Sequence, residues 1–204
     1  MVIERRRMNG LLIGLIAMGL IACSGSVRVP EDSFYRLDIP APEVVPVTAA
    51  IHGTLTVTVD AAAPIYRDRS LLYSSVDTPA RLQRYHYHHW IDTPPRLLER
   101  QLADYLQTAG VAPQVAARGD RLDGRYRLRL QLHRFEHVRG RDGGHVSLAA
   151  QLLLADGTDS ELLLREHIQV EQAVAGDTFP AVVEAYQRGV ADVFAQVQSM
   201  LERL

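Results

Sequence analysis

Hydrophobic and polar residues alternate along several stretches of the chain, a period that is typical of half-buried strands. In residues 53–62, leucine and valines alternate with threonines, and in residues 124–138 tyrosine and leucines alternate with arginines. Two further apolar stretches, 145–154 and 161–174, follow the turn sequences GRDGG and ADGTDS. The last three stretches therefore predict an antiparallel meander. Shorter strands are predicted over residues 34–40, 71–73 and 82–90.

Two other stretches carry hydrophobic residues at helical spacing. The first, 94–108, starts at a double proline, which a helix tolerates in its first turn because the missing N–H has no partner there, and it stops before Gly110. The second, 179–203, follows Thr178, a residue type that caps the amino ends of helices. Together the helices and strands predict a single α/β (α+β) domain with a mixed, largely antiparallel sheet packed by two main helices.

The first 22 residues have a different pattern from the rest of the chain. Three arginines at positions 5–7 precede an apolar run over residues 11–22, as in a signal peptide. The run is shorter than the ~20 apolar residues that a membrane-spanning helix needs. It ends in Leu-Ile-Ala followed by Cys23, which resembles the lipobox of bacterial lipoproteins. The resemblance implies cleavage between Ala22 and Cys23, and attachment of diacylglycerol and an N-linked acyl chain such as palmitate to Cys23.

Cys23 is the only cysteine, so the chain can form no intramolecular disulfide. An incidental or buried cysteine after an ordinary signal peptide is the alternative interpretation. In lipoproteins of this type an aspartate after the cysteine commonly signals retention in the inner membrane, so Ser24 implies the periplasmic face of the outer membrane. Residues 23–33 are then a tether, of which ten residues reach at most ~33–36 Å, and residues 34–204 form the domain.

The charge of the chain argues against nucleic acid as a partner. Without residues 1–22, which carry three arginines and one glutamate, the formal net charge falls from −2 to −4, and there is no basic footprint. The chain contains no lysine, so arginine supplies its permanent cations. The arginine face of residues 124–138 has two interpretations: a site for phospholipid headgroups or partner carboxylates, or an ordinary solvent-facing strand.

Histidine is concentrated in one place, the sequence RYHYHHWIDTPP. Alternation along this strand predicts Tyr85 and Tyr87 on one face and His86 and His88, with Trp90, on the other. Two histidines at this spacing act as ligands in some zinc sites, but no established ligand spacing accompanies them. The candidates for a third ligand are His133, His137 and His145. We therefore favour an exposed aromatic strand face over a metal site.

No catalytic motif accompanies these histidines. The sequence lacks the G-x-S-x-G elbow, the phosphate-binding loop and the G-x-G-x-x-G motif, and its acidic run at 155–161 lacks the ligand order of an EF-hand. We therefore expect no catalytic residue, no metal ion and no cofactor, and we predict that the protein is not an enzyme.

Four segments resemble the ABC-type transport auxiliary lipoproteins, the PqiC-like family. The sequence FYRL, at residues 34–37, follows soon after the lipobox. It is followed by LTVTVDAAAPIYRDRSLLYS at 55–74, LQRYHYHHWIDTPPRLLERQLADYL at 82–106 and YRLRLQLHRFE at 126–136, and an alanine- and valine-rich helix closes the chain. The resemblance covers nearly all of the mature region. The histidines at 86, 88 and 89 are a departure from the family's pattern.

The resemblance implies a fold similar to the N-terminal domain of TolB. It also implies a non-catalytic periplasmic lipoprotein, anchored in the outer membrane, that works with an MCE-domain protein, a permease and an ATPase. Such systems transport lipids or other hydrophobic molecules and support envelope integrity. Tyr85, Tyr87 and Trp90 would dock the partner, and self-association into a homo-oligomeric ring is a further expectation.

Two alternatives remain open. One is another envelope-assembly lipoprotein, such as an activator of a peptidoglycan synthase or a lipopolysaccharide-assembly factor. The other is a small metal-dependent periplasmic enzyme that uses His86 and His88.

Overall fold

The computed structural model describes residues 30–42, 49–120, 124–158 and 161–204. The chain divides into two units, residues 1–31 and Asp32–Leu204, and the fold below is that of the second unit. The predicted signal peptide, Cys23 and most of the predicted tether lie outside the described residues. The described part of the second unit contains one eight-stranded sheet and two α-helices.

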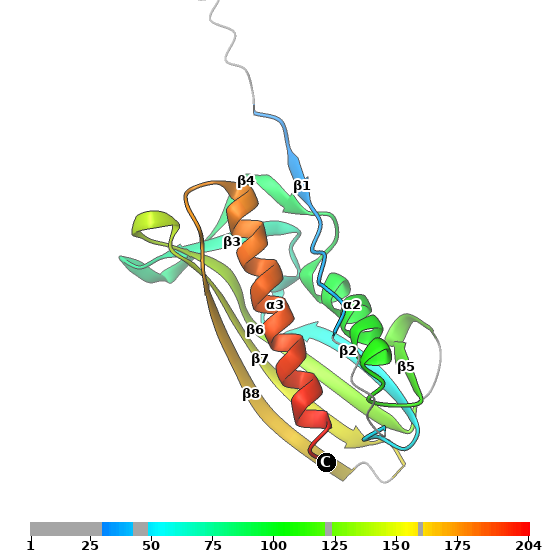
Figure 1. Cartoon of the computed structure of the whole chain (residues 1–204). Helices are drawn as coiled ribbons and strands as arrows, with labels where there is room; N and C mark the ends of the chain where they lie inside the picture. Colours follow the sequence, from blue (N-terminus) through cyan, green and yellow to red (C-terminus); the bar gives the residue numbers. More distant parts are fainter. Residues whose placement is uncertain (1–29, 43–48, 121–123, 159–160) are drawn as a thin grey trace, which may run out of the picture. The chain divides into compact units, whose positions relative to one another are not determined.

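The sheet is built around its longest strand, β6 (Tyr126–Arg139) (Figure 1). One edge of β6 pairs antiparallel with β7 (His145–Asp156), and β7 pairs antiparallel with β8 (Glu161–Ala173). These three strands are the predicted meander, which is confirmed. The remaining strands continue the sheet from the other edge of β6, and they are β1 (Ser33–Tyr35), β2 (Thr54–Ala61), β3 (Ser70–Ser75), β4 (Thr78–Trp90) and β5 (Gln114–Ala117).

Two strands share that other edge of β6, one after the other. β2 pairs in parallel with the first half of β6, and β3 pairs in parallel with its last residues. β5 adds to β2, whereas β4 and then β1 add to β3. A short 3-10 helix, η2 (Pro64–Arg67), bridges the interruption between β2 and β3. Its Tyr66 hydroxyl donates to the buried carboxylate of Glu136, 3.3 Å away, which also accepts from Ser74 Oγ at 3.1 Å.

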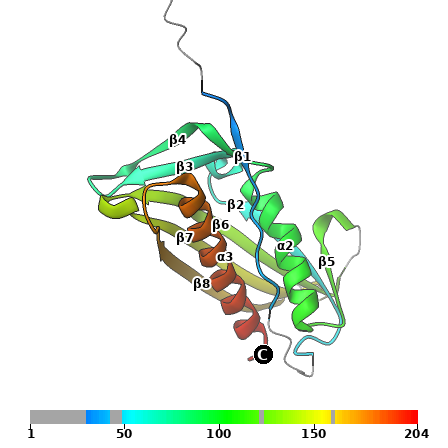
Figure 2. The ribbon, with the colours of Figure 1, turned by 45° about the horizontal axis from the view of Figure 1, so that its top comes forward.

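Both helices cover the same face of the sheet (Figure 2). α2 (Pro94–Ala109) packs on β2 and β5, and α3 (Phe179–Leu201) packs on β7 and β8. The double proline starts α2, Gly110 ends it with a left-handed φ of 72°, and Thr178 Oγ1 accepts the Ala181 N–H at the start of α3. The predicted mixed sheet with two main helices is therefore confirmed, and each helix end lies within two residues of its prediction.

A bulge in β6 decides which of its residues face the helices. Leu132 lies opposite Ala150 and Arg134 opposite Ala149, so β6 has one residue more than β7 at this point. Leu130 and Leu132, at even positions before the bulge, line a small cavity with residues of α3. After the bulge, in contrast, Phe135 packs on Tyr186 of α3 and His137 lines a cleft with Phe179. The bulge therefore points His137 toward the start of α3.

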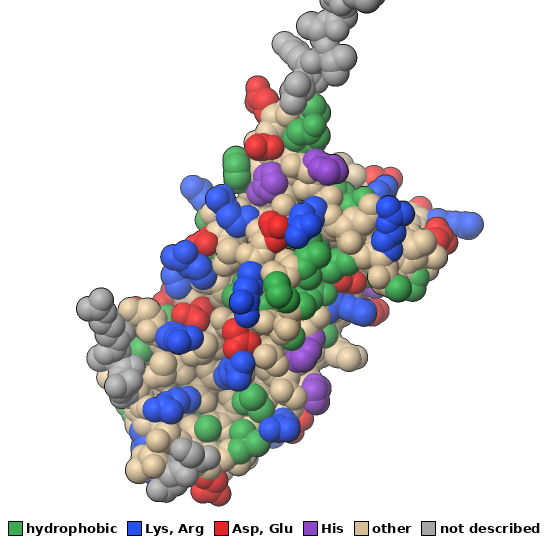
Figure 3. Space-filling view, turned by 180° about the vertical axis from the view of Figure 1, so that it is seen from behind, with side chains coloured by type: hydrophobic (Ala, Val, Ile, Leu, Met, Phe, Trp, Pro, Cys, Tyr) green, Lys and Arg blue, Asp and Glu red, His purple; other side chains and the backbone are tan. Residues whose placement is uncertain are grey.

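The opposite face of the sheet carries many of the arginines (Figure 3). Two members of the predicted arginine face form ion pairs with neighbouring strands: Arg125 with Asp156 at 3.0 Å and Arg129 with Asp60 at 2.6 Å. Their charges are therefore at least partly balanced within the domain, which favours the solvent-facing interpretation of this strand.

Candidate functional site

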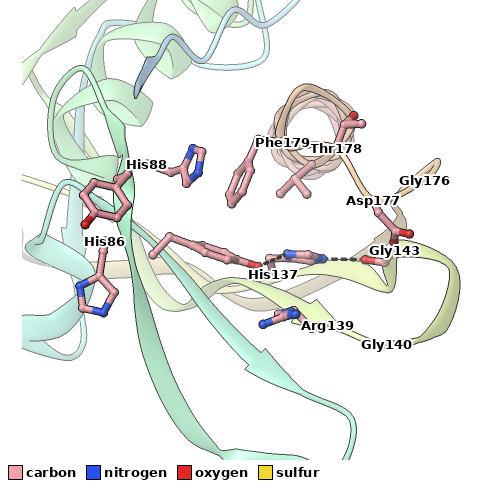
Figure 4. A pocket seen from close by; sticks show the side chains of 13 residues that line it. His86, His88, His137, Arg139, Gly140, Gly143, Gly176, Asp177, Thr178 and Phe179 are labelled. Atoms are coloured by element: carbon pink, nitrogen blue, oxygen red, sulfur yellow. Dashed lines mark hydrogen bonds between the residues drawn. The ribbon is translucent and has the colours of Figure 1, made fainter. Parts of the chain in front are cut away.

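A cleft of about 560 Å³ lies where β4, the end of β6 and the start of α3 meet (Figure 4). Its lining includes the rings of Tyr85 and His88 from β4 and of Phe179 from α3, together with His137 and Arg139 from β6. We call it the aromatic cleft. Its lining comes from segments that are far apart in the sequence, so only the folded domain can form it.

Tyr85 and His88 both point toward Phe179, although strict alternation would put them on opposite faces of β4. The reason is an irregular pairing of β4 with β3. Ser70 and Leu72 are two residues apart in β3, but their partners in β4, His89 and Arg84, are five residues apart. The extra residues in β4 break the alternation of its side chains. The Tyr85 ring meets Phe179 edge-on with centroids 4.7 Å apart, and the His88 ring stacks on it at 3.3 Å. The predicted separation of Tyr85 from His88 is therefore wrong.

His137 is the buried polar link of the cleft. Its Nε2 lies 2.7 Å from the carbonyl oxygen of Gly143, and its Nδ1 lies 2.9 Å from the Tyr85 hydroxyl. Because a carbonyl oxygen can only accept, Nε2 carries the proton and the Tyr85 hydroxyl donates to Nδ1. Burial lowers the pKa of His137, although its hydrogen bond to Gly143 opposes the shift. The ring therefore serves as a neutral donor and acceptor in this network.

Burial favours the neutral forms of Tyr85 and His88 in the walls of the cleft. His88 Nδ1 shares a hydrogen bond of 2.9 Å with the Tyr35 hydroxyl. Partial burial lowers the pKa of His88, and the positive charge that His89 can carry lowers it further. Burial raises the pKa of Tyr85 to about 12. Hydrophobic contact and hydrogen bonding, rather than charge, are therefore what these walls offer.

Arg139 supplies the positive charge of the cleft. Its guanidinium carbon lies 5.4 Å from the centroid of the Tyr73 ring, within the range of a cation–π contact. Within the described ranges no carboxylate forms an ion pair with Arg139, although Asp177 lines the same cleft. Tyrosine and arginine beside an apolar recess are residue types that commonly anchor protein partners.

The three residues predicted to dock a partner lie in different environments. Tyr85 is partly buried in the wall of the cleft, and Tyr87 lines the cleft with 38% of its surface exposed. Trp90 is only 1% exposed and packs edge-on against Tyr186, with ring centroids 5.0 Å apart. Trp90 therefore belongs to the core, and Tyr85 and Tyr87 are the members of the predicted set that a partner could touch.

The histidines do not assemble into a metal centre. His86 and His88 line the same cleft, but in the part of the chain that the structure describes, no group of three or more His, Cys, Asp or Glu side chains could hold a metal ion. Both ring nitrogens of His137 are occupied by the hydrogen bonds above. His89 lies 3.7 Å from Asp32 instead of joining the other two.

Sequence patterns alone did not single out Phe179 or Arg139. Each stands at the end of an element, Phe179 at the first position of α3 and Arg139 at the last position of β6. Phe179 continues the apolar stripe of α3, because the buried Val182 and Tyr186 follow it at helical spacing, so the pattern indicates a core residue rather than a cleft residue. For His137 the sequence indicates only a candidate third metal ligand.

Comparison with known proteins settles the family. The profile of the family described as ABC-type transport auxiliary lipoprotein component matches residues 35–198. The chain belongs to this family. Membership makes it an auxiliary lipoprotein component of ABC-type transport, as the sequence resemblance implied. No curated protein matches the chain.

Solved structures support the fold of this family member. Protein XCC0632 from Xanthomonas campestris, of the DUF330 family, is 20% identical with a TM-score of 0.71, over 83% of this chain and 95% of its own. An uncharacterized protein is 15% identical with a TM-score of 0.64, over 84% of this chain and 99% of its own. At these identities the likeness establishes the architecture. Ala22 and Cys23, the predicted cleavage and lipidation sites, lie outside the described residues, and no helix in the described ranges is long and apolar enough to cross a membrane.

Proposed function

We propose that this chain is the outer-membrane-anchored, non-catalytic component of an ABC-type system that transports lipids or other hydrophobic molecules through the periplasm, and that it docks an MCE-domain protein. Membership of the auxiliary lipoprotein family supports the transport role. The observation that supports docking is the aromatic cleft, where the rings of Tyr85, His88 and Phe179 share the lining with Arg139, which has no carboxylate in ion-pair contact among the described residues.

The cleft offers a partner apolar surface and the guanidinium of Arg139, and its lining also includes the Asp177 carboxylate. Tyr87 is exposed, and the rings of Tyr85 and Phe179 are already held in place by each other, so binding freezes little additional side-chain motion. Arg139 can donate to a carboxylate of the partner through its planar guanidinium. A partner loop that carries an apolar side chain next to an acidic one therefore fits this surface.

The proposed anchor is lipidated Cys23. Diacylglycerol and an N-linked acyl chain together exceed the two signals that stable membrane attachment requires. Ser33 lies ten positions after Cys23, a length of chain that spans at most ~33–36 Å, so the domain would work close to its own membrane. Envelope integrity would then depend on both the anchor and the docking surface.

A pull-down from detergent extracts tests the docking proposal. The unmodified chain is expected to recover the MCE-domain protein, and Arg139→Glu is expected to lose it because an acidic side chain would repel the partner's carboxylate. Arg127→Glu, which changes an exposed arginine of the opposite face, is the matched control and is expected to retain the partner.

Two results would count against the proposal. The docking role would be wrong if the MCE-domain protein is never recovered. The proposed lipid anchor at Cys23 would be wrong if Cys23→Ala leaves the protein on the membrane and the transport phenotype intact. Recovery of a peptidoglycan synthase or of lipopolysaccharide-assembly proteins in its place would favour the alternative envelope-assembly role. Native mass spectrometry of the same extracts reports whether several copies associate, as the expected ring requires.

A further inference from the structure

A second surface, on the other side of β4 from the aromatic cleft, combines exposed hydrophobic side chains with an arginine. Phe34 of β1 is 56% exposed and Ile91, just after β4, is 43% exposed. Phe34 lies opposite His89 in the parallel pairing of β1 with β4, and the Ile91 N–H donates to the Tyr35 carbonyl oxygen at 3.0 Å. The rings of Phe34 and His89 contact each other with centroids 5.6 Å apart, and Ile91 continues the β1–β4 ladder two residues after His89. We call Phe34, Ile91 and Arg69 the β1 patch.

Arg69 is held within this patch by two contacts. Its guanidinium carbon lies 5.5 Å from the centroid of the Phe34 ring, and its Nε donates to the Trp90 carbonyl oxygen at 3.2 Å. Among the described residues no carboxylate forms an ion pair with Arg69, while the nearby Asp32 lies beside His89. The patch thus presents a cation that is held beside the exposed Phe34 ring and bonded to the backbone of Trp90, the neighbour of the exposed Ile91. Figure 3 shows hydrophobic and histidine side chains gathered at this end of the sheet's open face.

The position of the patch in the chain indicates what covers it. β1 is the first element of the domain, and its Ser33 lies ten positions after Cys23. A chain of that length holds β1 within ~33–36 Å of the acyl chains, whatever the orientation of the domain. The exposed leucines of β8 lie at the opposite edge of the sheet from β1, because among the described strands β8 pairs only with β7. The exposed Val76 lies in the turn between β3 and β4, at the other end of β4 from the residues that pair with β1.

From this juxtaposition we propose that the β1 patch binds the phospholipid surface into which the chain is anchored. This inference rests on the proposed lipidation of Cys23. Phe34 and Ile91 enter the boundary between headgroups and acyl chains, where aromatic and apolar side chains of surface-bound proteins lie. Arg69 donates to lipid phosphate, which its planar guanidinium suits. His88 and His89 project to opposite faces of β4, so a membrane on the patch leaves the aromatic cleft open to a protein partner.

Tryptophan quenching by brominated phospholipids tests the proposal. The full lipidated chain is reconstituted into vesicles of phosphatidylethanolamine and phosphatidylglycerol with bromine on the acyl chains. Phe34→Trp and Ile91→Trp place reporters in the patch. Val76→Trp and Leu162→Trp are matched controls, because these side chains are 55% and 47% exposed. The native Trp90 is buried and adds the same background to every variant.

The patch reporters are expected to lose most of their added fluorescence in brominated vesicles, and the two controls are expected to keep theirs. Equal quenching at all four positions, or none at positions 34 and 91, would overturn the proposal. No partner protein is present, so that failure would leave the docking proposal standing. Flotation of the same vesicles reports the anchor separately, and a chain that does not float with them would contradict both the anchor and this inference.

Discussion

Replacing Tyr85 with phenylalanine tests the hydrogen-bond network of the aromatic cleft. The substitution keeps the ring that packs on Phe179 and removes the hydroxyl that donates to His137 Nδ1 at 2.9 Å. His137 is 6% exposed, so the loss leaves a buried acceptor without a donor. An unsatisfied buried polar group costs about 1–3 kcal/mol. We expect the free energy of unfolding to fall by about that amount.

Urea denaturation of the purified chain measures this loss directly, and thermal unfolding should show a lower Tm by about 2–4 °C for each kcal/mol in a domain of this size. Tyr87→Phe is the matched control. Tyr87 lies two residues away, is 38% exposed, and its hydroxyl forms no hydrogen bond with a described residue. The free energy of unfolding of Tyr87→Phe should stay within about 0.5 kcal/mol of that of the unmodified chain. Equal stability of the two variants would refute the role assigned to the Tyr85 hydroxyl.

Three further changes probe the surroundings of the cleft. The pKa of His137 is lowered in the folded state, so the unfolded state binds a proton more readily and the free energy of unfolding should fall as the pH drops below ~6.5. In His137→Gln the urea concentration at the unfolding midpoint should depend less on pH. The same pH dependence in the variant and the unmodified chain would contradict this. In Gly143→Ala, at a φ of 90°, the new Cβ would lie 2.2 Å from the Gly176 carbonyl oxygen, whereas Gly110→Ala, at a φ of 72°, meets nothing within 4 Å. Urea denaturation should therefore show that Gly143→Ala lowers the free energy of unfolding by more than the ~1–2 kcal/mol of left-handed strain expected for Gly110→Ala. Equal losses in the two variants would argue against the close approach of Gly143 to the Gly176 carbonyl oxygen. The fully buried Tyr186 hydroxyl has no partner among the described residues, so Tyr186→Phe should be neutral or stabilising by about 1–3 kcal/mol; a loss above ~1 kcal/mol by the same assay would mean that the hydroxyl is hydrogen-bonded.

Local patterns were enough to predict the helices and the meander. The boundaries of α2 and α3 follow from a double proline, a glycine and a threonine cap, each of which acts on its own neighbourhood. Strands β6, β7 and β8 are joined by short turns, so their order in the sheet follows their order in the chain.

The rest of the sheet depends on contacts between distant segments. Nothing in residues 54–75 alone shows that β2 and β3 would lie end to end along one edge of β6. Strict alternation also misplaced the side chains of β4, because its irregular pairing with β3 turns Tyr85 and His88 to the same side. The aromatic cleft was therefore out of reach of the sequence, since it needs the end of β6 and the start of α3 as well as β4.

The most direct test of the account is site-specific photo-crosslinking in cells from a photoreactive amino acid at position 87, on the rim of the aromatic cleft. Position 127, on the opposite face of the sheet, is the control. We predict an adduct with the MCE-domain protein from position 87 and none from position 127. No such adduct from position 87, in cells where the lipoprotein and the MCE-domain protein are both present, would contradict it.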